Sequence, residues 1–216
     1  MTQVYAAGEL STPTRYRERA GYDKAAVHEV LDQALHCDVA FVRDGRPVSL
    51  PTMHARSGET IYVHGSTGGR FALLNGEPIC ITVTLLDALV LARSWVNHSV
   101  GYRSVVAHGE ARIVRDPEER LAAMRALIDK MYPGRSAESR PPTAKEDAAT
   151  AIIALDLEIV SLKSRGDHVA DDESDLDGPY WAGTIALTTH REPPRTASDV
   201  PSGVAIPAAL ACGGIG

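Results

Sequence analysis

The residues best suited to hold a ligand lie in the segment IYVHGSTGGR, residues 61–70, directly after a predicted strand. The segment begins with three apolar, β-forming residues and then turns to glycines and small hydroxyls before a single cation, Arg70. Glycine lets a ligand approach the backbone, the Ser66 and Thr67 hydroxyls add donors, and a planar guanidinium suits a phosphate. The pattern therefore predicts a phosphate-sized nest at a strand end.

A second interpretation of this segment stays open, because a glycine-rich turn often serves only to reverse the chain. The segment has neither the GxGxxG spacing nor GxxxxGK followed by Ser or Thr, so the phosphate loops of α/β folds are not indicated. Two further polar clusters follow along the chain, NHSVGYRS at 97–104 and SLKSRGDH at 161–168. Each is typical either of a solvated loop at a strand end or of a ligand contact.

Length and composition limit the class of protein. The chain has 216 residues, 44% of them hydrophobic, which is enough for one domain with a substantial core. Its formal net charge is -6, so no overall positive field would recruit nucleic acid or an anionic membrane. No apolar run reaches the roughly 20 residues of a membrane-spanning helix, and MTQVYAAGEL lacks the order of a secretory signal. We expect a cytoplasmic protein.

The three cysteines, Cys37, Cys80 and Cys212, are far apart and form no CxxC pair. This spacing argues against a disulfide framework or a structural zinc site, and we predict no metal ligands. Cys80 lies in an apolar run, so the simplest interpretation is a small buried hydrophobic residue.

Local signals predict the elements that position the polar clusters. Helices are expected after Asp23 and after the start DPEE at 116–119, where an aspartate can cap and proline takes the first helical position. Asp44-Gly45 predicts a hairpin, and SGET at 57–60 predicts the next turn. The apolar run 79–92 is long for one strand and is expected to bend or bulge.

Further strands are predicted at 102–114, where Gly109 indicates a bulge or a close backbone contact, and at 152–162. Six strands with few long helices between them indicate a mainly β protein with flanking helices. We predict an N-terminal arm at 1–22, one domain at 23–187 and a flexible C-terminal tail at 188–216, where Pro, Ala, Ser and Gly are frequent.

The order of these motifs resembles a known family. The hairpin DGRP, then IYVHGSTGGR, NGEP, a long apolar strand, GYRSVVAHGEARIV and a DPEER helix resemble the pyridoxamine 5'-phosphate oxidase-like FMN-binding split barrels over about residues 12–187. The nitroimidazole-resistance-like, or flavin-nucleotide-binding, branch looks most similar. The resemblance implies a six-stranded antiparallel split β-barrel that forms a homodimer, with FMN at the subunit interface.

The resemblance also implies a set of cofactor-binding residues. The segment of the family that binds the flavin phosphate falls on His64, Gly65, Ser66, Thr67 and Arg70. The strand that lines the flavin ring through backbone groups falls on Pro51, Thr52 and Met53, and the segment that approaches the flavin or the partner subunit falls on Tyr102, Arg103 and Ser104. His64 is the one candidate catalytic residue.

The chain departs from the pyridoxamine phosphate oxidases themselves. Its loop has one arginine where they have an Arg-Lys pair, and the Arg-x-His substrate motif is missing, so pyridoxamine phosphate is not the expected substrate. The resemblance implies instead an FMN-dependent oxidoreductase that passes electrons from a reduced nicotinamide or similar donor to a small-molecule acceptor. Three alternatives remain: a deazaflavin protein, a haem protein with a ligand such as His168, or a non-catalytic flavin sensor.

A split barrel leaves one apolar face, and the run 79–92 is too hydrophobic to face water, which also favours a homodimer. Trp95 and Trp181 could cover that seam, although an intramolecular core is the simpler expectation for both.

Overall fold

The computed structural model describes residues 3–211, and Cys212 and the end of the predicted tail lie outside this range. The strands are β1 (Ala20–Gly21), β2 (His36–Arg43), β3 (Arg46–Ser57), β4 (Thr60–Ser66), β5 (Pro78–Leu91), β6 (Ser99–Glu110), β7 (Arg112–Ile113), β8 (Thr150–Asp156), β9 (Ile159–Arg165) and β10 (Gly183–Ala186). The helices are α1 (Lys24–Gln33), α2 (Pro117–Met131), α3 (Ala144–Ala148) and α4 (Ala208–Ala211), with short 3-10 turns that include η2 (Arg70–Leu73) and η3 (Trp95–Asn97).

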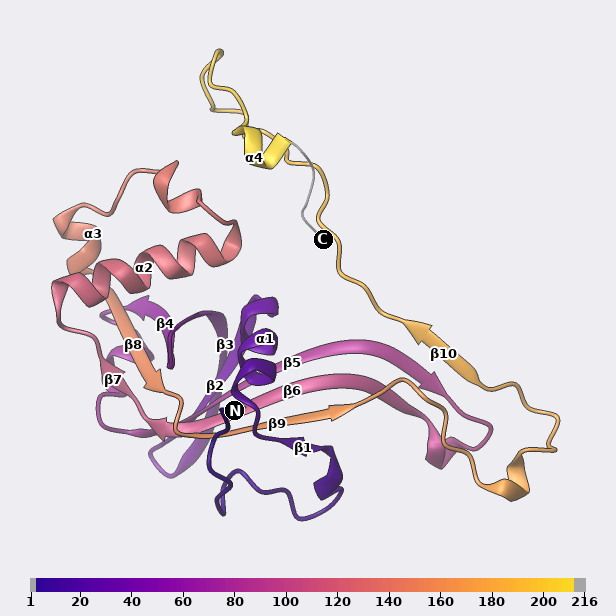
Figure 1. The fold of residues 1–216 in the computed structure, drawn as a ribbon. Coiled ribbons are helices and arrows are strands. Elements are labelled where there is room, and N and C mark those ends of the chain that lie inside the picture. The colour runs from indigo at the N-terminus through magenta and orange to yellow at the C-terminus, as the bar shows by residue number, and fades with distance from the viewer. Residues whose placement is uncertain (1–2, 212–216) are drawn as a thin grey trace.

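The strands form one antiparallel sheet that curves into a split barrel and does not close (Figure 1). Its order is β1-β9-β6-β5-β2-β3-β4-β8-β7, and β10 pairs with β5 off this path. The mainly β fold with flanking helices is confirmed, although the sheet has ten strands within the described residues where six were expected. The additional strands are mostly short, and β1 and β7 have only two residues each.

Both predicted turns are confirmed by the backbone. Asp44 and Gly45 join β2 to β3 with φ of 51° and 71°, the left-handed pair that a tight hairpin requires. Gly58, with φ of 58°, joins β3 to β4. These two turns fix the register of the three strands that lead to the glycine-rich segment.

Strand β5 is the longest strand and has the predicted bulge. It pairs with β6 over its length, and the register shifts between Leu86 and Ala88. Its first part also pairs with β2 from Ile79 to Thr82, and its last part pairs with β10. Strands β5 and β6 therefore extend well beyond the barrel as a long hairpin (Figure 1).

Both predicted helices are present with their predicted caps. The Asp23 side chain accepts from the Ala26 N–H at the start of α1. The Asp116 side chain accepts from the Glu119 N–H, and proline takes the first position of α2. Within the described residues no helix is both long and apolar enough to cross a bilayer.

The strand predicted at 152–162 is wrong as a single element, because β8 ends at Asp156 and β9 begins at Ile159 as a separate strand. Strand β8 pairs with β4, whereas β9 pairs with β6. Leu157 lies in the connection and is nevertheless buried in the core. The alternation of apolar residues therefore continues through the connection. For this reason the sequence pattern does not indicate where β8 ends.

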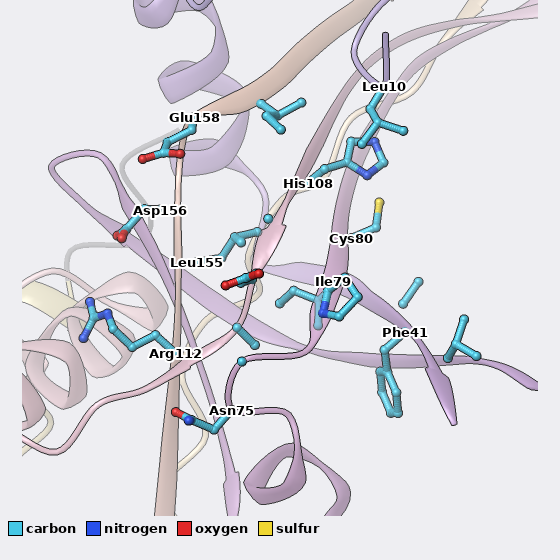
Figure 2. Close-up of a pocket in the computed structure, with 18 of the residues that line it drawn as sticks. Leu10, Phe41, Asn75, Ile79, Cys80, His108, Arg112, Leu155, Asp156 and Glu158 are labelled. Atoms are coloured by element: carbon cyan, nitrogen blue, oxygen red, sulfur yellow. The ribbon is translucent and has the colours of Figure 1, made fainter. Parts of the chain in front are cut away.

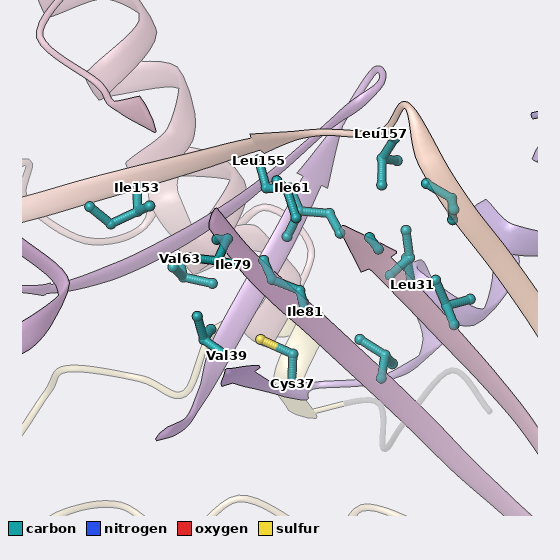
Figure 3. Close-up of a cluster of buried hydrophobic side chains, with 14 of the residues drawn as sticks. Leu31, Cys37, Val39, Ile61, Val63, Ile79, Ile81, Ile153, Leu155 and Leu157 are labelled. Atoms are coloured by element: carbon teal, nitrogen blue, oxygen red, sulfur yellow. The ribbon is translucent and has the colours of Figure 1, made fainter. Parts of the chain in front are cut away.

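The core lies inside the curved sheet under α1 and is built from the inward side chains of β2, β4, β5, β6, β8 and β9 (Figure 3). The N-terminal segment, expected to be a loose arm outside the core, contributes the buried Tyr5 to it. The Tyr5 hydroxyl donates to Glu59 at 2.9 Å and lies 3.0 Å from the His28 ring. The expectation of buried tryptophans is wrong, because Trp95 and Trp181 are 94% and 69% exposed.

The C-terminal end of α1 is held by side chains from two other elements. The His54 Nε2–H of β3 donates to the Leu31 carbonyl at 2.9 Å, and Lys130 of α2 donates to the carbonyls of Leu31 and Asp32. His54 is completely buried, and burial lowers the pKa of His54 to about 4. The folded protein therefore keeps this imidazole neutral.

The buried His54 predicts a defined acid sensitivity. Between about pH 6.5 and pH 4 the unfolded chain takes up a proton at this residue and the folded chain does not, so the free energy of unfolding falls as the pH falls. At about 1.4 kcal/mol per pKa unit, the loss from this group is roughly 3 kcal/mol. We expect His54→Gln, measured by urea unfolding across this range, to show a smaller pH dependence than the wild type. The exposed His168→Gln should retain the wild-type dependence, and an equal slope in both variants would contradict the prediction.

Candidate functional site

The glycine-rich segment lies where the sheet splits. Strand β4 pairs with β3 only from Thr60 to Val63 and pairs with β8 as far as Ser66. On the other side, β3 leaves β4 at His54 and pairs with β2 instead. The two strands therefore diverge, and residues 64–70 leave the sheet beside the opening.

Two glycines in this segment are required by close contacts. A Cβ on Gly65 would lie 2.9 Å from the buried Phe71 ring. A Cβ on Gly69 would lie 3.0 Å from the Ser66 carbonyl oxygen. These positions allow the chain to fold back tightly before η2, so part of the glycine content has a local structural reason.

The backbone donors of the segment are already used within the chain. The Thr67 N–H donates to the Ala149 carbonyl at 2.9 Å, and the Gly68 and Gly69 N–H groups donate to Ser66 at 3.2 Å and 2.8 Å. The nest predicted from sequence therefore has fewer free N–H groups than expected. Arg70, in contrast, is exposed and has no hydrogen-bond or ion-pair partner among residues 3–211, so its guanidinium is available to an anion.

A cavity of about 400 Å³ adjoins this segment and was not predicted. It is lined by Thr67, Arg115 and Arg120, among others. Arg120 is committed to the Asp147 carboxylate at 2.7 Å and to backbone carbonyls, so it braces the cavity wall. Arg115 is exposed and has no partner in the described part of the chain. Arg115 was not predicted as a site residue, because it directly precedes the helix cap Asp116 and belongs to no recognisable binding motif.

The other predicted site residues lie on two separate parts of the sheet. Pro51 and Met53 face the outer side of β3, because they pair with Asp38 and His36 on the outer side of β2. Thr52 faces the opposite, inner side with its partner Cys37. The candidate catalytic residue His64 is exposed and has no partner within the described residues.

The segment Tyr102–Ser104 divides its side chains between the two faces of β6. Ser104 faces outward and lies 3.0 Å from the Thr84 hydroxyl, and Tyr102 is on the same face. Arg103 faces α1, where it binds both oxygens of Asp87 at 2.9 Å and 3.0 Å and lies 3.4 Å from Glu29. Two carboxylates therefore occupy the Arg103 guanidinium.

Residues of β3 and β6 do not meet within one copy of the chain. Strands β2 and β5 lie between them, which at about 4.8 Å per strand separates the two groups by about 14 Å. The outer faces of Pro51 and Met53 and of Tyr102 and Ser104 nevertheless belong to the same surface.

A larger cavity opens at the end of the barrel near the β2–β3 hairpin, with a volume of about 1140 Å³ (Figure 2). Its wall includes Phe41, Ile79, Cys80, His108 and Leu10 of the N-terminal segment. Figure 2 shows Leu10 beside His108 and Cys80, so the N-terminal segment forms part of this wall. The half-buried His108 has no hydrogen-bond partner in the described part of the chain.

In the third polar cluster, residues 161–168, the arginine side chain donates to backbone carbonyls of the same cluster. Arg165 donates to the carbonyls of Gly166 and His168 at 3.1 Å and 3.2 Å, and His168 is exposed. Lys163 pairs in register with Ser104 and is half-buried on the outer face of the sheet. Within this cluster the Arg165 guanidinium is therefore occupied by backbone carbonyls, whereas the His168 ring is exposed.

The split barrel and its glycine-rich opening define the class of protein, and comparison with family models agrees. The model described as pyridoxamine 5'-phosphate oxidase matches residues 23–164, about two thirds of the chain. The chain therefore belongs to this family, and the resemblance drawn from its motifs is confirmed. No curated protein matches the chain.

Two solved structures are similar over most of their length. The flavocytochrome Anf3 from Azotobacter vinelandii is 34% identical, covers 97% of this chain and 98% of its own, and has a TM-score of 0.90. The FAD- and haem-binding protein from Mycobacterium smegmatis is 36% identical, covers 89% of this chain and 95% of its own, and has a TM-score of 0.84. A 5-nitroimidazole resistance protein from Bacteroides thetaiotaomicron shares the fold at 19% identity, with a TM-score of 0.55 over 67% of this chain and 85% of its own.

Proposed function

We propose that the chain is a redox protein that binds a flavin at the interface of a homodimer and also binds haem. The observation that carries the proposal is the extent of the match to a flavocytochrome and to an FAD- and haem-binding protein, 97% and 89% of this chain. The nitroimidazole resistance protein covers only 67%. The haem-containing relatives therefore also share parts of the chain outside the common barrel.

The flavin site that we propose uses Arg70 as its main anion contact. The Arg70 guanidinium has no partner within residues 3–211, and the hydroxyls of Ser66 and Thr67 lie in the same turn. The backbone N–H groups of residues 67–69 are already occupied. A flavin phosphate would therefore be bound mainly by side chains, whereas a nest would bind it through backbone N–H groups. Arg115 is a second cation at the adjoining cavity.

The second copy has a specific part in this proposal. Pro51 and Met53 of one subunit would lie against one side of the flavin, and Tyr102 and Ser104 of the partner subunit would approach the other. Arg103 is expected to hold the β6–α1 contact, because Asp87 and Glu29 already occupy it.

When bound, a flavin accepts electrons in pairs or singly, and a haem accepts them one at a time, so together they link a two-electron donor to a one-electron step. The residues of the chain position these groups and exclude water from them. We propose a reduced nicotinamide or similar donor and a small-molecule acceptor, and His64 is the candidate for a proton transfer near the flavin.

The cofactors of freshly purified protein test this proposal directly. We expect a visible spectrum with a flavin band near ~450 nm and a haem band, and mass analysis after denaturation should identify a flavin and protoporphyrin. The FAD of the Mycobacterium relative favours FAD over FMN as the released flavin. A deazaflavin identified by mass after denaturation would instead indicate a deazaflavin protein, and tight flavin binding with no turnover for any donor and acceptor would favour a sensor. Protein that binds neither flavin nor haem would contradict the proposal.

A further inference from the structure

The cavity of about 400 Å³ lies directly beside the proposed phosphate contact. Thr67 and Ala72, which line it, stand on either side of Arg70 in the chain. Strand β8 lies between β4 and β7, and its first residues, Thr150 and Ala151, also line the cavity. The glycine-rich turn after β4 and the chain that leaves β7 therefore border the cavity from two sides.

Arg115 lines the cavity from the β7 side, close enough to act together with Arg70. It follows Val114, whose N–H donates to the Ile152 carbonyl, so it leaves the sheet level with the first residues of β8. Ser66, at the end of β4, pairs with Thr150 on the opposite side of β8. Two strand spacings of about 4.8 Å place the two backbones about 10 Å apart. Two long arginine side chains can span this gap with a ligand between them.

The charges of the lining favour an anion. The charged residues that line the cavity are Arg115, Arg120 and Asp147. Arg120 binds the Asp147 carboxylate at 2.7 Å and also donates to the carbonyls of Val114 and Thr150, so these two charges offset each other. Arg115 is exposed and has no hydrogen-bond or ion-pair partner in the described chain. One unpaired positive charge therefore remains at the cavity.

The rest of the lining suits a nucleoside. Both side-chain contacts of Arg120 with Asp147 use Oδ1, and the Asp147 side chain is 44% exposed, so Oδ2 can accept hydrogen bonds from sugar hydroxyls. Ala72, Ile113 and Ala148 add apolar surface for a flat base. The volume of about 400 Å³ lies within the range of about 300–1,000 Å³ that is usual for small-molecule sites.

We propose that this cavity holds the adenosine monophosphate half of FAD. Arg115 binds the second phosphate, and Asp147 accepts from the ribose hydroxyls. The assignment rests on the proposed function, because it requires Arg70 to hold the first phosphate of a flavin. The two phosphates of FAD share one bridging oxygen, whereas FMN has only the first of them. Arg115 is therefore a specificity-determining residue that favours FAD over FMN.

Titration of the flavin-free full-length protein with FAD and with FMN, followed by flavin fluorescence, tests this assignment. We expect the wild type to bind FAD more tightly than FMN. Arg115→Ala should bind FAD about 10-fold or more weakly, because a hydrogen bond to a charged group is lost. Its affinity for FMN should stay within about twofold of the wild type, since FMN does not reach this cavity.

Two further variants accompany this one. Ala148→Trp places a bulky side chain at an exposed position that lines the cavity, and it should weaken FAD binding while leaving FMN binding unchanged. Arg125→Ala is the matched control, because Arg125 is another exposed arginine with no partner among the described residues and it lies outside the cavity lining. It should bind both flavins as the wild type does.

Different results separate the two proposals. If the wild type binds neither flavin, the flavin part of the proposed function and this assignment both fail. If the wild type binds both flavins equally well, or if Arg115→Ala keeps the FAD affinity or loses affinity for FAD and FMN alike, only this assignment fails. Circular dichroism shows that each variant is folded.

Discussion

Arg70→Ala is expected to weaken flavin binding about 10- to 100-fold. Hydrogen bonds to a charged group contribute about 1.5–3 kcal/mol, and about 1.4 kcal/mol corresponds to a factor of ten in affinity. The guanidinium has no partner within the described residues, and the neighbouring N–H groups are occupied, so no other group in the turn can replace it fully. Flavin content of the purified variant and titration of its apoprotein with FAD and FMN measure the effect.

The control for this experiment is Arg46→Ala. Arg46 is an exposed arginine at the opposite end of β3, beside the Asp44–Gly45 turn, and its loss should leave flavin binding unchanged. Arg70→Lys should recover only part of the affinity, because an ammonium keeps the charge and loses the planar fork. Wild-type flavin content in Arg70→Ala would exclude this arginine from the site.

Leu155→Ala is expected to lower the free energy of unfolding by about 2–5 kcal/mol, since it removes a large side chain from the core. Leu155 is 1% exposed and lies on β8, inside the sheet. Its Cδ1 would be 2.7 Å from a Cβ on Gly109 of β6, which confirms the close backbone contact predicted for that glycine. Gly109→Ala should therefore cost about 1–3 kcal/mol through overpacking.

The two substitutions are expected to compensate each other. In Leu155→Ala the space next to Gly109 is free, so Gly109→Ala should cost much less in that background, with a coupling of about 0.5–3 kcal/mol. Urea unfolding of the wild type, both single variants and the double variant gives this value. Gly21→Ala is the matched control, because a Cβ there would lie 3.9 Å or more from its nearest neighbours. Strictly additive costs would show that the contact is relieved elsewhere.

Local signals predicted the parts of the fold that depend on a few neighbouring residues. The Asp116 cap and the Asp44–Gly45 hairpin are read from residue types whose backbone geometry is nearly fixed. The break between β8 and β9 was not predictable in this way. Leu157 packs into the core through contacts with distant strands, and the sequence around it has the alternation of a continuous strand.

The candidate site divides in the same way. The position of Arg70 after a strand end follows from its own segment, and its guanidinium has no partner in the part of the chain that the structure describes. The N–H groups of residues 67–69 are occupied by hydrogen bonds to Ala149 and within a tight turn. No sequence motif specifies these hydrogen bonds. The pairing of Arg103 with Asp87 joins β5 and β6 beside the bulge between Leu86 and Ala88, and no local motif specifies it. Long-range pairing therefore decides which predicted residues are available to a ligand.

Strand β10 has a consequence for shortened forms of the chain. It covers the edge of β5 from Ala88 to Leu91, beyond the point where β2 leaves that edge at Thr82. Truncation before Gly183 would expose these backbone N–H and C=O groups as a template for pairing with other molecules. The region that matches the family ends at residue 164, so a fragment limited to it lacks β10 and would be prone to aggregate.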